Sequence, residues 1–134
     1  MSSLQEPLFS IFVLLARFLL SSVFLVSGIH KAGWYSKADQ EFRRSSVPLV
    51  PLVLPATIAL HLVGSICIIL GIFITEAALS LAVFTLAATL WVHRFWQHTG
   101  DERLDLSRNV LANLGVVGGL ILLAATGPGK YVLL

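Results

Sequence analysis

Four apolar runs, each long enough to cross a bilayer as a helix, constrain the fold of this chain more than any other feature. They cover roughly residues 8–29, 52–74, 77–95 and 109–127. A helix needs about 20 apolar residues to cross the hydrocarbon core. Backbone polar groups find no water there, so only helices and closed barrels span it, and nothing in these runs resembles barrel strands. The sequence therefore predicts an all-α integral membrane protein.

The composition supports this fold class. Hydrophobic residues make up 57% of the chain and charged residues 12%, whereas soluble domains carry about 25% charged residues. A length of 134 residues suits a single domain, residues 1–134. The first run has no basic segment before it and is too long for a signal peptide, so we expect a retained span. The basic residues flank apolar runs, which indicates the lipid membrane and no nucleic acid as a partner.

Local signals order the runs into an antiparallel four-helix transmembrane bundle. The link Thr75-Glu76 leaves room only for a very short turn between the second and third spans. The Gly-Pro-Gly sequence at 127–129 ends the fourth span, because glycine adopts the left-handed C-cap and proline cannot continue a helix. Gly115 and Gly119 are four residues apart and permit close helix approach, which also allows a homodimer face.

The polar segment between the first two spans predicts a short interfacial helix over about residues 34–45. Trp34, Ala38 and Phe42 recur every four residues and form one apolar stripe, while the charged residues lie largely elsewhere around the helix. The alternative is a plain loop with scattered aromatic residues.

The basic residues also predict the orientation of the bundle. The links between spans 1 and 2 and between spans 3 and 4 carry Lys31, Lys37, Arg43, Arg44, Arg94, Arg103 and Arg108. The other side of the membrane carries Lys130. Because Lys and Arg concentrate on the cytoplasmic side, both links are predicted to be cytoplasmic and both termini to lie outside.

Arg17 is the most informative polar residue, because it stands within span 1, where an arginine costs about 2.5 kcal/mol or more. It should therefore face the bundle or water. His61 in span 2 is predicted at a similar depth, where a neutral imidazole can accept a hydrogen bond from the guanidinium. These side chains are candidates for binding an anionic or carbonyl-bearing ligand. The alternatives are that Arg17 snorkels or caps backbone carbonyls, and that His61 is a satisfied core histidine.

A polar stripe is predicted on one face of span 3, where Thr85, Thr89, His93 and Gln97 follow one another every four residues. Asn113 in span 4 is predicted to face this stripe. Such a seam either joins the helices, at roughly 0.6–2 kcal/mol per hydrogen bond, or lines a cavity for a polar head group.

The stretch "LWVHRFWQH" (90–98) has the aromatic and basic residues of an anchor at the membrane interface. An anchor explains the residues around His93 but not His93 itself. His93 is therefore the best candidate for a catalytic side chain.

The remaining histidines and the cysteine predict no metal site and no covalent cofactor. His61 is several residues deep and His93 is near the exit of its span, so the two are offset for haem ligation. No HxxxH or HxxE spacing supports a metal ion. Cys67 lies in apolar surroundings, which make a thiol inert.

Together these residues resemble the DoxX family of small four-span membrane proteins. The resemblance covers about residues 16–129 and rests on "ARFLLSSVFLVSGIHKAG" (16–33), "LHLVGSICIILGIFITEAAL" (60–79), "LAVFTLAATLWVHRFW" (81–96) and "NLGVVGGLILLAATGPGKY" (113–131). The arginine of span 1, the SG-x-x-K exit, the H-x-FW exit and the GPG terminus match the family's pattern. His61 stands where the family usually carries a glutamate.

The resemblance implies a protein of the bacterial cytoplasmic (inner) membrane that is linked to redox modules. Some members resemble the small subunit of a thiosulfate–quinone oxidoreductase, and others associate with oxidative-stress enzymes. We therefore expect an accessory subunit of a quinone-linked oxidoreductase, with a soluble or membrane redox partner. Its polar pocket for a quinone or similar small ligand is predicted to include Arg17, His61, Thr89, His93 and Asn113.

Two alternatives to the oxidoreductase subunit stay open. The first is a non-enzymatic membrane scaffold or assembly factor for a redox or stress-response complex, docked through the charged segment 98–108. The second is a carrier for a small anion or lipid, which four short spans without an inverted repeat support weakly.

Overall fold

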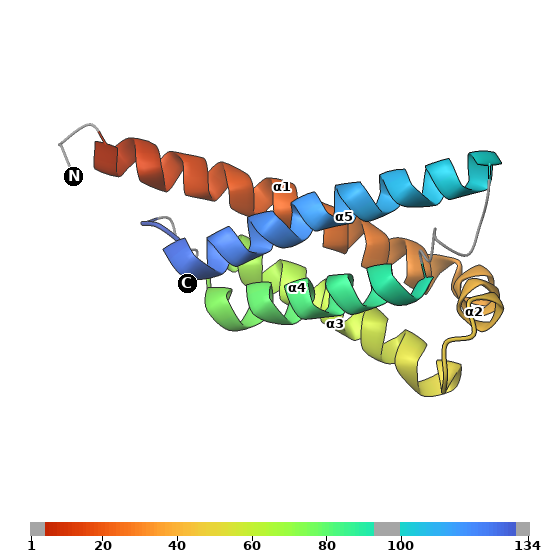
Figure 1. Ribbon diagram of the computed structural model, residues 1–134. Helices are drawn as coiled ribbons and strands as arrows, with labels where there is room; N and C mark the ends of the chain where they lie inside the picture. The colour runs from red at the N-terminus through yellow and green to blue at the C-terminus, as the bar shows by residue number, and fades with distance from the viewer. Residues whose placement is uncertain (1–4, 93–99, 131–134) are drawn as a thin grey trace.

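In the described residues, 5–92 and 100–130, the computed structural model contains five α-helices (Figure 1). They are α1 (Gln5–Gly33), α2 (Tyr35–Arg44), α3 (Val50–Leu70), α4 (Ile74–Val92) and α5 (Gly100–Thr126). Four of them, α1, α3, α4 and α5, are long and apolar enough to cross a membrane. The predicted all-α membrane bundle is therefore confirmed.

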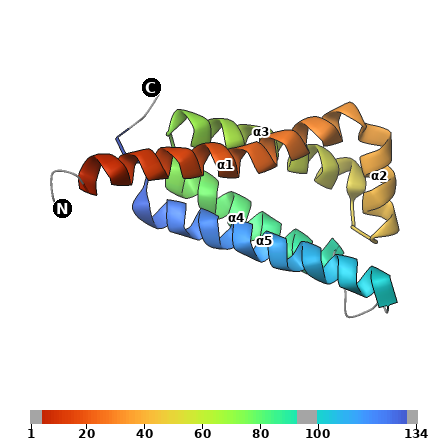
Figure 2. The same cartoon turned by 90° about the horizontal axis from the view of Figure 1, so that it is seen from above.

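The four long helices alternate in direction and form two antiparallel pairs (Figure 1). α1 packs mainly on α3, and α5 packs mainly on α4. The α3–α4 hairpin joins the pairs on one side, whereas α1 and α5 touch each other less. Figure 2 shows α1 and α5 diverging toward the end of the bundle that carries α2. We call this end the α2 end, and the opposite end, which holds residues 127–129, the GPG end.

Glycines allow close contacts between the helices at some of the predicted positions. A Cβ atom added to Gly28 of α1 would lie 2.9 Å from Cδ2 of Leu62 on α3. A Cβ atom on Gly119 of α5 would lie 3.1 Å from Cδ2 of Leu20 on α1, which confirms its predicted close approach. In the described part of the chain, no heavy atom lies within 4 Å of the corresponding position on Gly115. The homodimer face stays a prediction.

The turn between α3 and α4 lies earlier than the predicted link at Thr75-Glu76. Gly71 adopts a left-handed φ of 81°, and its N–H donates to the carbonyl of Cys67 at 2.9 Å. α4 then begins at Ile74, and Glu76 lies in its first turn, where the helix dipole favours a carboxylate. The predicted position was wrong because apolar residues continue past the glycine C-cap and conceal it in the hydropathy pattern.

α5 begins at Gly100, well before the predicted span over 109–127. The part of α5 that is apolar enough to cross a membrane is Ser107–Thr126. The prediction therefore located the span but not the polar turns that precede it. Asp101, Asp105 and Arg108 are compatible with helix there because their side chains are exposed. Arg108 and Asp105, for example, form an exposed ion pair with 4.0 Å between Nη1 and Oδ1.

The helix predicted at 34–45 is present as α2. Ala38 is buried and Phe42 half-buried in a cluster with Val50 and Leu54 of α3. Part of the apolar stripe therefore packs on the bundle rather than on lipid. Trp34, at 63% exposure, remains accessible just before the helix. The position of α2 in the membrane interface stays a prediction.

Candidate functional site

Arg17 is fully buried at the GPG end of the bundle. Its Nε donates to the carbonyl of Ile68 at 2.9 Å, its Nη2 to the carbonyl of Ile69 at 2.6 Å, and its Nη1 to the carbonyl of Pro128 at 3.1 Å. The last four carbonyls of a helix lack an intrahelical donor, and a positive charge beside them is favoured by the helix dipole. Arg17 therefore caps the end of α3 and ties it to the segment after α5, in agreement with the carbonyl-capping alternative.

The Gly-Pro-Gly segment ends α5 and packs against the start of α1. Gly127 has a left-handed φ of 78°, and its N–H donates to the carbonyl of Leu123 at 2.9 Å. Gly129 lies so close to α1 that an added Cβ atom would be 3.4 Å from Cα of Ser10. The backbone N–H of Lys130 donates to the Ser10 hydroxyl at 3.3 Å. The GPG end of the bundle is thus closed by contacts among α1, α3 and the end of α5.

Arg17 and His61 do not share a site, contrary to their predicted similar depth. An added Cβ atom on Gly28 would lie 3.2 Å from Cβ of His61, so His61 packs beside Gly28, whereas Arg17 packs beside Ile68. Gly28 follows Arg17 by eleven residues on α1, which corresponds to about 16 Å along the helix axis. The prediction was wrong because an apolar run gives the length of a span but not its offset, and α1 extends beyond its neighbours at its N-terminal end (Figure 1).

A cavity of about 290 Å³ lies between the two helix pairs, toward the α2 end. Its walls include three of the predicted ligand-binding residues, His61, Thr89 and Asn113. The other walls come from the second half of α1, from α2 and from α4. The volume is just below the usual range for ligand pockets, which is about 300–1,000 Å³. The polar groups of three spans thus converge on one space, and we call it the inner cavity.

His61 is buried on the α3 wall of the inner cavity between two aromatic rings. Its ring centroid lies 5.4 Å from that of Phe24 and 5.3 Å from that of Phe84, in edge-on arrangements. No hydrogen-bond partner for Nδ1 is present among the residues that the structure describes. Because most buried polar side-chain atoms are hydrogen-bonded, His61 does not match the alternative of a satisfied core histidine.

Thr89 and Asn113 face each other across α4 and α5, as predicted. Nδ2 of Asn113 donates to the Thr89 hydroxyl at 3.0 Å, and Thr89 is almost fully buried. This bond uses one of the two amide hydrogens of Asn113, and in it the hydroxyl accepts rather than donates. The second amide hydrogen and the hydroxyl hydrogen are therefore not used by the seam itself.

Three residues at the α2 side of the inner cavity were not predicted as site residues. Nζ of Lys31 donates to the hydroxyl of Ser27 at 2.6 Å, and both residues line the cavity together with Glu41 of α2. The SG-x-x-K exit of span 1 could have indicated the first two, because its spacing places Ser27 and Lys31 on one helical face. Glu41 had no comparable signal, because the packing of α2 on the bundle brings it to the cavity.

The structure therefore divides the predicted site residues. It brings together His61, Thr89 and Asn113, and it separates Arg17 from them. His93, the best catalytic candidate in the sequence, lies outside the described residues, as does Gln97.

Comparison with known proteins identifies relatives that share most of the length of this chain. The chain is 27% identical over 123 residues to the inner membrane protein YphA of Escherichia coli (strain K12), covering 92% of this chain and 88% of YphA. It is 32% identical over 119 residues to the inner membrane protein YqjF of the same organism, covering 89% of this chain and 86% of YqjF. A stretch of 74 residues is 27% identical to the ER-derived vesicles protein ERV29 of Saccharomyces cerevisiae, covering 55% of this chain and 24% of ERV29. No solved structure matches the chain.

The sequence profile of the DoxX family matches residues 12–94, which include most of α1 and all of α2, α3 and α4. The match therefore contains Arg17 and the inner-cavity walls that α1, α2, α3 and α4 supply, whereas Asn113 on α5 lies outside it. It covers more than half of the 134 residues. The protein belongs to the DoxX family of membrane proteins.

Proposed function

We propose that the inner cavity holds the head group of a quinone, or of a similar small ligand with carbonyl oxygens, and that the protein is a membrane subunit of a quinone-linked oxidoreductase. The observation that supports this proposal is the convergence of His61, Thr89 and Asn113 on one cavity inside a membrane-spanning bundle. A cavity of this kind, mostly apolar with a few convergent polar groups, is typical of small-molecule sites.

The chemistry of the cavity walls suits a flat ligand with two oxygen atoms. On α3, Nδ1 of His61 can donate a hydrogen bond in one neutral tautomer and accept one in the other. On the other helix pair, Asn113 and Thr89 keep donor hydrogens that their mutual bond does not use. Phe24 and Phe84 add apolar surface beside His61. A quinone carries two carbonyl oxygens on an apolar ring, so its oxygens can bond to both helix pairs at once.

The proposed role in electron transfer is that of an accessory subunit. Conversion of a quinone to a quinol consumes two electrons and two protons, and we assign the electrons to a separate redox partner protein. The chain's own groups hold the ring, and the His61 imidazole carries a proton to the carbonyl oxygen that it bonds. Lys31 and Glu41 line the α2 side of the same cavity, and we assign to them the transfer of protons from water to the site.

The proposed orientation puts the α2 end in the cytoplasm and both termini in the periplasm of a bacterial inner membrane. Described basic residues at the α2 end are Lys31, Lys37, Arg43, Arg44 and Arg108. At the GPG end, Lys130 is exposed, whereas Arg17 is buried against backbone carbonyls. This asymmetry follows the excess of Lys and Arg in cytoplasmic loops. The inner cavity then lies near the cytoplasmic surface, where a soluble electron donor can approach it.

Ligand binding by the inner cavity can be tested by native mass spectrometry of the purified protein with a short-chain ubiquinone. His61→Leu should weaken binding about tenfold or more, because one hydrogen bond in a buried site is lost. His30→Leu is the matched control, since His30 lies on α1 but does not line the inner cavity. Absence of any quinone adduct, or equal binding by wild type and His61→Leu, would contradict the proposal.

A non-enzymatic scaffold is the second candidate, and the first turns of α5 favour it. α5 begins at Gly100, whereas its membrane-spanning part begins at Ser107. About two helical turns therefore precede the span. Asp101 and Asp105 are exposed on these turns. If they dock a cytoplasmic partner, Asp101→Lys with Asp105→Lys should remove that partner from pull-downs out of solubilised membranes. An unchanged set of co-purifying proteins would argue against the scaffold.

A further inference from the structure

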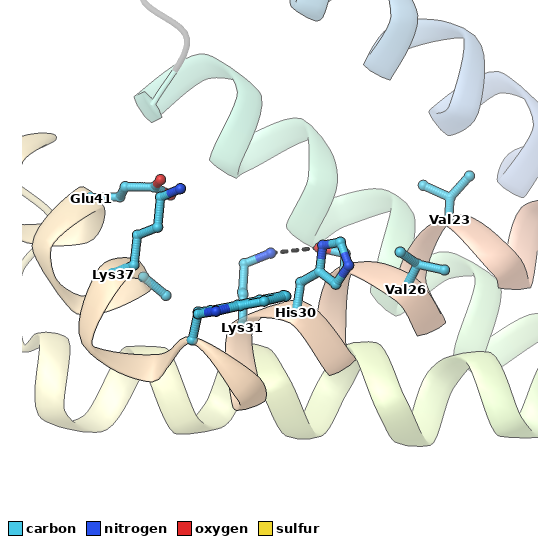
Figure 3. Close-up of a pocket in the computed structure, with 9 residues that line it drawn as sticks. Val23, Val26, His30, Lys31, Lys37 and Glu41 are labelled. Carbon is cyan, nitrogen blue, oxygen red and sulfur yellow. Dashed lines mark hydrogen bonds between the residues drawn. The ribbon is translucent and has the colours of Figure 1, made fainter.

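A second hollow lies outside the bundle, in the corner between the last turns of α1 and the helix α2 (Figure 3). Its volume is about 730 Å³. It shares Val23, Ser27, Lys31 and Glu41 with the inner cavity but has its own outer wall, which includes His30, Trp34 and Lys37. We call it the outer hollow. The proposed quinone site does not account for these outer residues.

The outer hollow is apolar at one end and cationic at the other. Val23 and Val26, 48% and 50% exposed, form the apolar end on α1. His30 and Lys31 follow one to two turns later on the same helix, and Lys37 lies beyond them on α2 (Figure 3). Val23 and Lys31 are eight residues apart, which is about 12 Å along the helix. Because α1 spans the membrane, the valines lie at the depth of lipid tails and the lysine nearer the head groups.

The cationic end carries charge that the described protein does not neutralise by ion pairing. The ammonium of Lys31 donates to the hydroxyl of Ser27 at 2.6 Å. Within residues 5–92 and 100–130, neither Lys31 nor Lys37 is in an ion pair, whereas Arg43 of the same helix α2 is paired with Asp39 at 2.9 Å. Glu41 also lines the hollow and attracts the ammonium of Lys31 electrostatically, so two ammonium groups and one carboxylate leave a net positive charge.

An exposed tryptophan indicates that the cationic end of the outer hollow lies in the membrane interface. Trp34 is 63% exposed, and its ring lies edge-on to that of His30, with 5.2 Å between centroids. Tryptophan is enriched at the level of lipid head groups, where its ring contacts both apolar and polar surroundings. The cationic end of the outer hollow is therefore at the depth at which a membrane offers phosphate groups.

We propose that the outer hollow binds one anionic glycerophospholipid. Lys31 and Lys37 hold its phosphate, and an acyl chain lies along Val23 and Val26. A free phosphate ion would use the lysines but leave the apolar walls without a contact. A zwitterionic lipid would bring its own positive charge to a site that is already positive. A lipid with an anionic head group and apolar chains matches both ends of the hollow.

The experiment is native mass spectrometry of delipidated, detergent-solubilised protein titrated with phosphatidylglycerol or with phosphatidylcholine of the same chain length. We expect one phosphatidylglycerol to be retained at concentrations about fivefold or more below those needed for phosphatidylcholine. Lys37→Gln should weaken phosphatidylglycerol retention about fivefold, the effect of one lysine beside an anionic head group. Lys31→Gln should have a similar effect.

Arg43→Gln is the matched control, because it removes one charge from α2 at a side chain that is paired with Asp39 and does not line the hollow. It should leave phosphatidylglycerol retention unchanged. His61→Leu should do the same, which separates this proposal from the quinone site. Lys37 is exposed, so Lys37→Gln tests the proposal even if Lys31→Gln disturbs folding.

Three results would overturn the proposal. Equal retention of the two lipids would remove the need for an anionic head group. Equal weakening by Arg43→Gln and Lys37→Gln would indicate a diffuse basic surface instead of a site. Displacement of phosphatidylglycerol by millimolar inorganic phosphate would indicate an anion site that does not need the lipid chains.

Discussion

Two polar side chains that are buried in the bundle, Arg17 and His61, differ in how their polar atoms are satisfied. Arg17 donates three hydrogen bonds to carbonyls at the GPG end. His61 leaves Nδ1 without a partner in the described part of the chain and lines a cavity. A hydrogen-bonded charged group can stabilise the fold, whereas a buried polar atom without a partner is costly and is typical of functional sites. Arg17 therefore has a structural role, whereas the unpaired nitrogen of His61 supports its proposed role in ligand binding.

Replacing Arg17 should destabilise the protein strongly. Arg17→Met removes hydrogen bonds from three buried or half-buried carbonyls, and each bond to a charged group contributes about 1.5–3 kcal/mol. We expect a loss of about 3 kcal/mol or more in the free energy of unfolding, measured as a lower midpoint of thermal unfolding in detergent. Arg43→Met, at an exposed ion pair, should change it by less than about 1 kcal/mol. A midpoint for Arg17→Met equal to that of wild type would contradict the capping role.

Replacing His61, in contrast to replacing Arg17, should change the stability of the protein little. His61→Leu removes a buried nitrogen without a partner, which costs about 1–3 kcal/mol in the native protein. It also removes two edge-on ring contacts with Phe24 and Phe84, worth about 0.5–1.5 kcal/mol each. The two effects are similar in size, so the thermal midpoint in detergent should stay close to that of wild type. A fall of many degrees would show that the imidazole is a structural residue.

At the scale of helices, much of the fold could be predicted, because hydropathy and helix length are local properties. The four spans and α2 were predicted close to their observed places. The α3–α4 turn was misplaced because Gly71 ends α3 inside an apolar run, and the start of α5 was missed because its first turns are polar. The facing of Thr89 and Asn113 was predicted from spacing alone. The separation of Arg17 from His61 was not, because the offset of α1 against α3 depends on three-dimensional packing.

The packing of α1 on α3 can be tested at Gly28. A Cβ atom there would lie 2.9 Å from Leu62 and 3.2 Å from Cβ of His61, so Gly28→Val should push the helices apart and cost about 1–3 kcal/mol. Gly118→Val is the matched control, since no described heavy atom lies within 4 Å of the corresponding position on α5. Thermal unfolding in detergent should show a lower midpoint for the first variant only. Equal midpoints for the two variants would mean that α1 does not approach α3 this closely.

At the scale of the whole molecule, the two helix pairs are joined at the GPG end and separate toward the α2 end (Figure 2). Arg17 links α1, the end of α3 and the segment after α5. The inner cavity lies where the pairs separate. The contacts that close the bundle therefore lie at one end of the molecule and the proposed ligand site at the other.

The proposed orientation can be tested by labelling single cysteines in spheroplasts. In a Cys67→Ala background, Lys130→Cys at the GPG end should react with an impermeant maleimide added from outside. Gln40→Cys, at an exposed position on α2, should react only after the membrane is permeabilised. The reverse pattern would place the α2 end in the periplasm and would contradict the orientation derived from the basic residues.

The most direct test of the proposed ligand site is photo-crosslinking with an azido-quinone, followed by mapping of the labelled peptides. Labels should fall on the inner-cavity walls, at residues 23–31 of α1 and 84–89 of α4 and near Asn113, and excess unmodified quinone should suppress them. Labels at the GPG end around Arg17, or labels that excess quinone does not suppress, would contradict the assignment of the inner cavity as a quinone site.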